Sequence, residues 1–388
     1  MNIPLYYSWR NVWARKVTTL LTALGMGLVV FVFASVLMLS EGLRQTLVAT
    51  GSPDNVMVIR QGSETEVQSN IDRAEAALIE SLPEIPYAGT GQKQVSSEAL
   101  VLMVLDKRQD HKRSNVIIRG LSDAGIALRP QARLVAGRWF RAGASEIVAG
   151  IRVAEGFAGA GIGESLHFGL RDWQVVGVFD AGSTGFSSEI WSDVEQLMQA
   201  FRRNTYSAVL FRLPGESAFE AMKQRLEGDP RISVEAQRET RFYAEQSEQL
   251  ATFLAILGVV LSSVFSLGAM IGALITLYGA VASRTREIGT LRALGFDPRS
   301  ILTAFLLESL LVGMAGGVIG LGFAAGLQFI TISTMNWQSF SELAFSFVLT
   351  PRIALQALLI AVLMGLLGGL LPALKAARMN VIEALRSA

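Results

Sequence analysis

Long runs of apolar residues constrain the fold of this chain more than any other feature. Four stretches carry at most one charged residue, and each is long enough for a helix to cross a bilayer, which takes about 20 apolar residues. They are Leu20 to Leu39, Ala251 to Ser283, Ile301 to Ile330 and Ile353 to Leu374. Because 51% of the residues are hydrophobic and only 17% are charged, we expect a membrane protein with four transmembrane α-helices.

The basic residues of the short connecting segments predict how these helices are oriented, because lysine and arginine favour the cytoplasmic side. Four spans place three basic segments on one side: Arg10, Arg15 and Lys16; Arg284, Arg286, Arg292 and Arg299; and Lys375, Arg378 and Arg386. Both chain termini are therefore expected in the cytoplasm. Residues 40–250 and the connection 331–352 are expected on the opposite side.

The large segment outside the membrane is predicted to form an extracytoplasmic α+β domain over residues 50–237. A strand, a helix and a strand follow one another twice, which is typical of two split βαβ units. The first unit comprises Asn55 to Arg60, Glu66 to Ser81 and Ala99 to Leu105, and the second comprises Tyr206 to Leu213, Glu216 to Leu226 and Ile232 to Val234.

Residues 106–204, between the two units, are predicted to form an inserted β-rich subdomain. Its expected strands are Val116 to Ile118, Glu146 to Val148, Ser165 to Phe168 and Trp173 to Phe179. Ser192 and Glu195 form a capping-box pattern, which predicts the start of a short helix.

The second apolar run is longer than a bilayer requires, and helical periodicity continues upstream of it. No glycine or proline interrupts the pattern between Arg238 and Gln249. One interpretation is a tilted span that follows an unrelated surface helix. We favour the other, in which residues 238–283 form one helix that rises from the membrane as a stalk and transmits movement along its axis.

Glycines four residues apart occur in the spans, where they let helix backbones approach closely. Gly268 and Gly272 form such a pair in the second span, and Gly316 and Gly320 form one in the third. Packing within one chain would explain these pairs. Because four helices enclose little volume, we also expect a second copy, with these glycines at the dimer interface.

Glu308 is the only ionisable residue within a predicted span. Such residues are often functional. A helix-packing or interfacial contact and a role in substrate handling or coupling remain equally compatible with its position, and we assign it no catalytic role.

The segment 284–300 predicts a short amphipathic helix between the second and third spans. Ile288, Leu291 and Leu294 recur at helical spacing, and Gly295 stands where the helix would end. Such a helix would either lie on lipid headgroups or dock into a groove of a soluble partner. The pattern fits both.

Several kinds of chemistry are missing from the sequence. The chain has no cysteine, and no Gly-Lys dipeptide, which a phosphate-binding loop of the Walker type requires. Its two histidines are far apart, and its net charge of +1 gives no reason to expect nucleic acid. We therefore expect no enzyme, no metal and no cofactor in this chain, so any ATP would bind to another one.

Four segments of the chain resemble the FtsX/MacB family, the type VII ABC transporter permeases. The clearest is RTREIGTLRALG, from Arg284 to Gly295. SWRNVWARKVTTLLTALGMGL resembles the family's amphipathic N-terminal helix and first span, LVAGRWF with EIVAG and VVGVF its periplasmic core domain, and LPALKAARMNVIEALR its closing segment. Val17 and Val381 depart from an arginine and a proline that are common there.

This resemblance implies a stand-alone permease subunit that pairs with a second permease copy or a paralogue and with two copies of a separate ABC ATPase, which hold ATP and Mg. Nucleotide-driven closing of the ATPases would move the stalks and the periplasmic domain, a mechanism called mechanotransmission. The residues implied to couple to the ATPase are Arg284, Arg286, Glu287, Ile288, Leu291, Arg292, Leu294 and Gly295.

The implied task is efflux of a substrate from the periplasmic side or the outer leaflet, with a periplasmic adaptor and an outer-membrane channel as further partners. Two alternatives stay open: extraction of lipoproteins or lipids toward a lipoprotein carrier, and a signalling module that activates a cell-wall hydrolase. The expected segments are 1–49 (cytoplasmic helix, first span and start of the stalk), 50–237, 238–283, 284–300, 301–330, 331–352, 353–374 and a cytoplasmic tail over 375–388.

Overall fold

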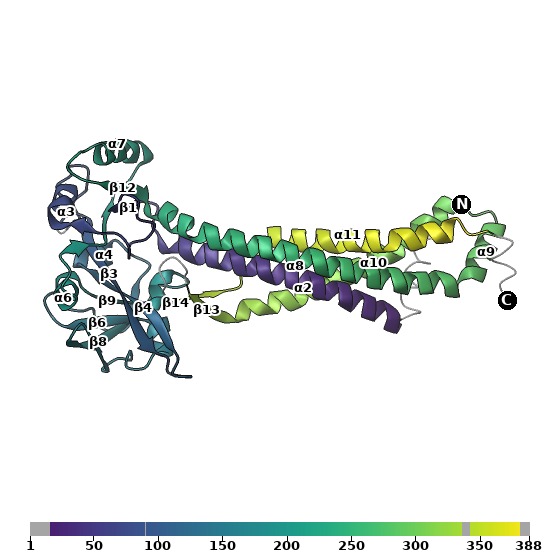
Figure 1. Ribbon diagram of the computed structural model, residues 1–388, viewed down its shortest axis with the longest axis horizontal. Helices are drawn as coiled ribbons and strands as arrows, with labels where there is room; N and C mark the ends of the chain where they lie inside the picture. Colours follow the sequence, from purple (N-terminus) through teal and green to yellow (C-terminus); the bar gives the residue numbers. More distant parts are fainter. Residues whose placement is uncertain (1–15, 90, 336–341, 381–388) are drawn as a thin grey trace. The chain divides into compact units, whose positions relative to one another are not determined.

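A computed structural model describes residues 16–89, 91–335 and 342–380 (Figure 1). The chain divides into two compact units. The helical unit comprises the described residues of Met1–Gly42, Thr252–Ile330 and Ser346–Ala388, and the sheet unit comprises Leu43–Ala251 and Thr331–Phe345. The predicted cytoplasmic helix before the first span and the end of the predicted tail lie outside the described residues.

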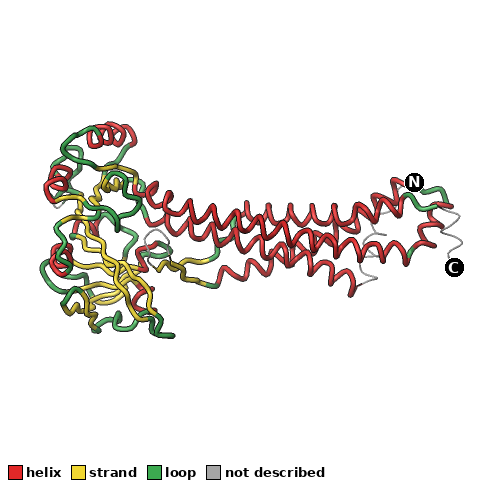
Figure 2. Tube along the Cα trace, viewed as in Figure 1, coloured by secondary structure: helices red, strands yellow, loops and turns green. Residues whose placement is uncertain are grey.

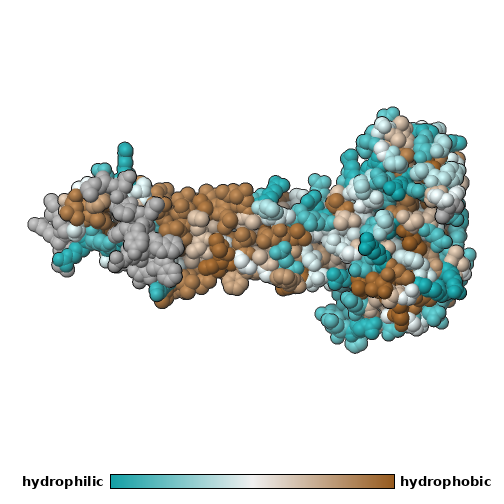
Figure 3. Space-filling model, turned by 180° about the vertical axis from the view of Figure 1, so that it is seen from behind, coloured by the Kyte–Doolittle hydropathy of each residue, from teal (hydrophilic) through white to brown (hydrophobic). Residues whose placement is uncertain are grey.

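Four long helices confirm the four predicted spans by length and composition (Figure 2). They are α2 (Lys16–Thr50), α8 (Glu239–Ser283), α10 (Pro298–Gly326) and α11 (Pro351–Ala377). Proline at the first turn begins α10 and α11, where its missing N–H would have no helical partner. Figure 3 shows hydrophobic side chains gathered along the helical unit, as a bilayer would require.

The second of these helices, α8, is uninterrupted over 45 residues. This confirms the prediction of one long helix and excludes the alternative of a separate surface helix before the span. Residues 239–251 of α8 belong to the sheet unit, and the rest of the helix belongs to the helical unit.

One side of the sheet unit is built from the two predicted βαβ units. They contain β1 (Asn55–Arg60), α3 (Arg73–Glu80), β3 (Val95–Asp106), β11 (Ala208–Arg212), α7 (Glu216–Glu227) and β12 (Val234–Arg238). The strand order is β12-β1-β11-β3, with every neighbouring pair antiparallel. Strand β11 therefore lies between the parallel strands β1 and β3, and β1 lies between β11 and β12. Both units are split, as predicted.

The inserted β-rich segment continues this sheet and does not form a separate one. Its strands are β4 (Arg113–Leu121), β5 (Arg133–Gly137), β6 (Glu146–Gly150), β7 (Ser165–Phe168), β8 (Arg171–Asp180) and β9 (Glu189–Asp193). The long strand β3 joins the two parts, because Val95–Glu98 pair with β11 and Ala99–Asp106 pair with β4. Trp173, Phe168 and Ile118 are buried in the core of this part.

Several element boundaries differ from the prediction, among them those of α3, α6 (Val194–Ala200) and β12. Helix α3 begins at Arg73 because Ile71 and Asp72 form the short strand β2 with β10 (Thr205–Tyr206). Helix α6 is capped by Asp193, whose carboxylate accepts a hydrogen bond from the Gln196 N–H at 2.9 Å. Ser192 does not cap this helix, because Ser192 belongs to strand β9, where it pairs with Gly120 of β4 and Ile147 of β6. Strand β12 begins at Val234, where the predicted strand ends.

The connection 331–352, predicted only as a loop, contains two paired strands, β13 (Thr331–Met335) and β14 (Glu342–Ser346). Strand β14 packs on the sheet unit through Leu343 and Phe345, which are buried. The Glu342 carboxylate lies 2.7 Å from Lys107 Nζ, and the Ala344 N–H donates to Ser188 Oγ. The alternation in Glu-Leu-Ala-Phe-Ser is the sequence signal for this half-buried strand.

Candidate functional site

The amphipathic helix predicted between the second and third spans is α9 (Thr285–Ala293). Its inner face is formed by Ile288, which is 1% exposed and packs in an apolar cluster with Val281, Ile301 and Phe305. The predicted stop is confirmed: Gly295 has φ +91°, a left-handed conformation that favours glycine, and follows directly on the last turn.

The predicted coupling residues of this segment therefore divide between two faces. Ile288 and Arg284 are turned toward the helical unit, and Leu291 and Arg292 are half-buried. The exposed members are Arg286, Glu287, Leu294 and Gly295. Leu294, directly after α9, is 67% exposed, so a partner can reach this large apolar side chain.

The start of α9 is tied to α10 by an ion pair inside the helical unit. Arg284 Nη1 donates to Glu308 Oε2 at 3.2 Å, and Arg284 Nε donates to Glu287 Oε2 at 2.8 Å. The guanidinium also lies over the ring of Phe305, 5.2 Å from its centroid. Arg284 and Glu308 are both buried. Glu308 thus has a helix-packing contact, one of the two roles that its position predicts.

The predicted glycine pairs have different surroundings. A β-carbon on Gly316 would lie 2.5 Å from the Ala23 carbonyl oxygen, and one on Gly320 would collide with the Gly27 carbonyl. Gly316 and Gly320 therefore bring α10 against α2 within one chain. Among the described residues, and apart from the neighbouring residues and backbone of α8 itself, no heavy atom lies within 4 Å of a β-carbon built on Gly268 or Gly272.

Gly268 and Gly272 instead lie in an open groove between α2 and α8 with a volume of about 500 Å³. Leu28, Val264 and Phe265 are among the apolar side chains that line it. The walls of the groove are almost entirely apolar, which suits lipid or another apolar helix and offers no group for catalysis.

A buried cluster of charges lies in the sheet unit, and sequence reasoning missed it. Its centre is Arg119 on β4, which is 1% exposed. The guanidinium binds Glu189 through two hydrogen bonds of 2.8 Å, Glu66 through bonds of 2.6 and 3.3 Å, and Glu98 through one of 2.9 Å. All five of its N–H donors are used. The available signal was an arginine within the apolar strand sequence Val-Ile-Ile-Arg.

Glu98 joins this arginine to a second one. Arg129 Nη1 and Nη2 donate to the two Glu98 oxygens at 2.5 and 2.8 Å. Burial alone would raise the pKa of Glu98, but the charges of Arg129 and Arg119 outweigh it and lower the pKa below its ordinary value. The carboxylate therefore stays ionised inside the sheet unit. Within the described ranges, no group of three or more His, Asp or Glu side chains is arranged to hold a metal.

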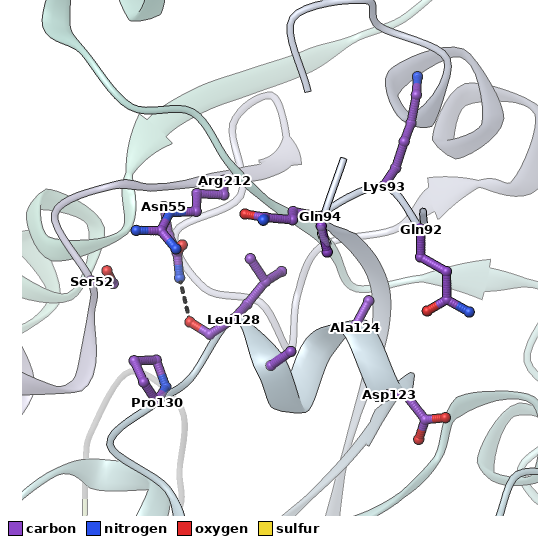
Figure 4. Close-up of a pocket in the computed structure, with 12 residues that line it drawn as sticks. Ser52, Asn55, Gln92, Lys93, Gln94, Asp123, Ala124, Leu128, Pro130 and Arg212 are labelled. Atoms are coloured by element: carbon purple, nitrogen blue, oxygen red, sulfur yellow. Dashed lines mark hydrogen bonds between the residues drawn. The ribbon is translucent and has the colours of Figure 1, made fainter. Parts of the chain in front are cut away.

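A cavity of about 350 Å³ in the sheet unit is lined in part by the short helix α4 (Asp123–Ala127) (Figure 4). Leu128 and Pro130 form an apolar wall, and Asn55, Gln94 and Arg212 form a polar one. The Asn55 amide is turned toward the Leu128 carbonyl, to which it donates at 3.0 Å. The lining of the cavity mixes apolar, amide and charged side chains.

Two family models together cover most of the chain. A MacB-like periplasmic core domain matches residues 19–228, more than half of the chain, and an FtsX-like permease C-terminal domain matches residues 259–381. The chain belongs to the FtsX/MacB family of ABC transporter permeases. The first match ends before α8 begins and the second starts within α8, so both parts of the family architecture are present.

Among the relatives of this permease, an uncharacterized ABC transporter permease YknZ of Bacillus subtilis is 25% identical, and the match covers 97% of this chain and 96% of YknZ. A macrolide export ATP-binding/permease protein MacB of Bdellovibrio bacteriovorus is 23% identical over 98% of this chain, which spans only 61% of that protein. A solved structure of the extracellular domain of YknZ from Gram-positive bacteria also matches this chain, with 14% identity and a TM-score of 0.36. The match covers 47% of this chain and 99% of the chain in that structure.

Substitution of Glu308 by glutamine tests whether the ion pair holds α9 to α10. The variant Glu308→Gln leaves the buried Arg284 without its carboxylate on α10. We expect a loss of about 1–3 kcal/mol, seen as a lower thermal unfolding midpoint in detergent. The control is Glu195→Gln, which removes an ion pair with Arg73 that is about half exposed and should change the midpoint little. Equal midpoints in the two variants would contradict the assignment.

Two glycines of α10 test the close packing of α10 on α2. In Gly320→Val the added side chain meets the backbone of Gly27, so the permease should lose about 1–3 kcal/mol of stability. Gly322→Val adds the same side chain at an open position of the same helix. Unfolding midpoints of the two purified variants provide the comparison, and an equal effect would show that the predicted contact is not made.

Proposed function

We propose that this permease couples ATP hydrolysis on a separate ATPase to movement of its sheet unit, and that this mechanotransmission drives export of a substrate. The observation that carries the proposal is α9, a short helix clamped by Ile288 and Arg284 with Leu294 exposed beside it. A clamped helix that presents an apolar side chain suits docking into a groove of a soluble partner. Helix α8, which precedes α9 in the chain, is uninterrupted, and its first residues belong to the sheet unit.

The names of two relatives favour export over the alternatives. The MacB relative is described as a macrolide exporter, and PvdT of Pseudomonas entomophila, 25% identical over 99% of this chain, as a pyoverdine exporter. This chain spans 59% of PvdT. Both relatives are described as combined ATP-binding/permease proteins. For this permease we propose that ATP binds to a separate ATPase subunit, present in two copies.

The proposed location is the cytoplasmic membrane, with both termini in the cytoplasm and the sheet unit outside. This orientation puts the basic segment that contains α9 on the side where ATP is available. It also puts the acidic connection with Glu342 on the other side, where β14 packs on the sheet unit.

A second copy of the permease is proposed to cover the groove at Gly268 and Gly272. In the most apolar 18-residue stretch of α8, only 11% is buried within the described chain. The same share is 33–44% for the other three long helices. The small-residue pair of α8 is open, whereas the pair of α10 is already used. A copy of the same helix fits such a surface, because two backbones approach closely where both carry glycine.

The docking of α9 is tested with Leu294→Asp. The charge should prevent burial of this side chain in a partner and reduce recovery of the ATPase with affinity-purified permease by about tenfold or more. Quantitative mass spectrometry of material from native membranes in mild detergent provides the measurement. The matched control is Leu170→Asp, because Leu170 is 85% exposed in the sheet unit. Undiminished recovery with Leu294→Asp would remove the support for docking here.

The dimer is tested by disulfide cross-linking. The natural chain has no cysteine, so an introduced cysteine has no other cysteine of the permease to react with. Gly272→Cys should form a disulfide-linked dimer in oxidised membranes, because the interface brings two copies of this residue together. Gly322→Cys, an equally open glycine on α10, should remain monomeric on a non-reducing gel. The dimer interface is assigned wrongly if the two variants cross-link to the same extent.

A further inference from the structure

The junction between strand β12 and helix α8 contains a buried carboxylate that no part of the proposed mechanism has used. Glu239 is the first residue of α8 and follows Arg238, the last residue of β12, without a loop. Its side chain is 0% exposed. Glutamate is rarely buried unless it is paired, so this position requires an explanation.

Glu239 connects three segments of the sheet unit. Its Oε2 accepts hydrogen bonds from the Ser52 N–H and the Asn55 side-chain amide, both at 2.9 Å. The same Asn55 amide nitrogen donates to the Leu128 carbonyl at 3.0 Å. The other oxygen, Oε1, lies 4.0 Å from Arg129 Nη2. One carboxylate thus holds the start of α8 to the segment after α2, to β1 and to the segment after α4.

The end of α2 lies against the same point. A β-carbon on Gly51 would lie 2.6 Å from the backbone nitrogen of Thr240, so the turn after α2 touches the first turn of α8. Thr50, the last residue of α2, makes two bonds to segments outside α2: its Oγ1 accepts from the Gly185 N–H at 2.8 Å, and its carbonyl accepts from the Gln131 amide at 3.0 Å. Both long helices that lead into the sheet unit are therefore fixed where they meet.

A second contact of α8 lies one turn beyond Glu239. The Tyr243 hydroxyl donates to Glu66 Oε2 at 3.3 Å, and Glu66 binds Arg119. Residues four apart lie on the same face of a helix, so Glu239 and Tyr243 attach one face of α8 at two heights. Arg129 and Glu98 continue the chain of charges from Glu239 to Arg119, and so to strands β3, β4 and β9.

These contacts fix the orientation of the start of α8 more than they stabilise the folded state. A buried ion pair often stabilises no better than well-packed apolar residues of the same volume. Hydrogen bonds of defined geometry, however, prevent a helix from rotating or sliding, which apolar packing alone permits. A rotation of α8 about its axis would break the bonds of Glu239 and Tyr243 together.

We propose that Glu239 is the positioning residue through which α8 moves the sheet unit, with Asn55 and Arg129 as its partners. This inference rests on the proposed mechanotransmission and assigns its point of transfer. Axial movement of α8 passes through Glu239 to β1 and, through Arg129 and Glu98, to the centre of the sheet. Without the carboxylate, less of the movement of α8 would reach β1 and Arg129.

The test measures movement at two places in the full-length permease, purified with its ATPase. A spin label on Ile256→Cys reports on α8, and one on Leu170→Cys reports on the sheet unit; both positions are exposed. Distances between the labels of two copies are measured by pulsed electron paramagnetic resonance without nucleotide and with a non-hydrolysable ATP analogue. In the otherwise unchanged chain we expect nucleotide to shift both distances.

In Glu239→Ala we expect the shift at Ile256 to persist and the shift at Leu170 to fall about threefold or more. In Glu239→Gln the side-chain carbonyl can still accept the hydrogen bond from the Ser52 N–H, so we expect most of the Leu170 shift to be retained. If the negative charge itself were required, the shift would fall as it does in Glu239→Ala. Glu195→Ala removes an exposed ion pair of the same sheet unit and should leave both shifts unchanged. If circular dichroism shows that Glu239→Ala does not fold, Asn55→Ala replaces it, because it removes the bond from Asn55 to Glu239.

Different results would overturn the proposed function and the role of Glu239. No nucleotide-dependent shift at Ile256 in the otherwise unchanged chain would overturn the proposed function itself. A shift at Ile256 together with an undiminished shift at Leu170, in the folded Glu239→Ala or Asn55→Ala variant, would overturn only the role of Glu239.

Discussion

The bilayer interior provides no water for unpaired backbone groups, and the helical unit follows from this constraint. Every segment that crosses the hydrocarbon must bond its own N–H and C=O groups, which leaves the helix as the form for these four apolar runs. Lipid is as apolar as leucine, so the helices gain little from the hydrophobic effect when they associate. Close backbone contact has to hold them together. Gly27, Gly316 and Gly320 provide it between α2 and α10, and Gly313 and Gly365 provide it between α10 and α11.

The same constraint explains why charge is used so sparingly in the helical unit. Glu308 is acceptable within α10 because Arg284 is brought beside it from the start of α9. The sheet unit folds under different conditions: it has the apolar cores around Phe211 and Trp173, and its buried arginines are paired with carboxylates. Arg119 is the most completely paired, because all five of its N–H groups are bonded to carboxylates.

The sequence predicted those features that depend on local pattern. Uncharged length gives the four spans, the lack of glycine and proline gives the continuity of α8, and the order of strand and helix gives both split βαβ units. Features that depend on which distant residues meet were missed or left open. Nothing local indicates that Arg119 faces Glu66, Glu98 and Glu189, or that Gly316 is covered while Gly272 is open. The amphipathic pattern of α9 likewise does not say that Ile288 faces inward and Leu294 outward, because both lie on its apolar side.

Helix α8 has a buried charged residue at each end. Glu239 begins it, and Arg284 follows its last residue, Ser283. Each of the two is bonded to groups from other elements of its own unit: Glu239 to Ser52 and Asn55, and Arg284 to Glu308. A stiff helix transmits force only if neither end can slip, because a free end converts axial movement into rotation or local bending. In the proposed mechanotransmission, the charged residues would therefore lie where slippage would occur, and the 45 residues of the helix would need only to remain continuous.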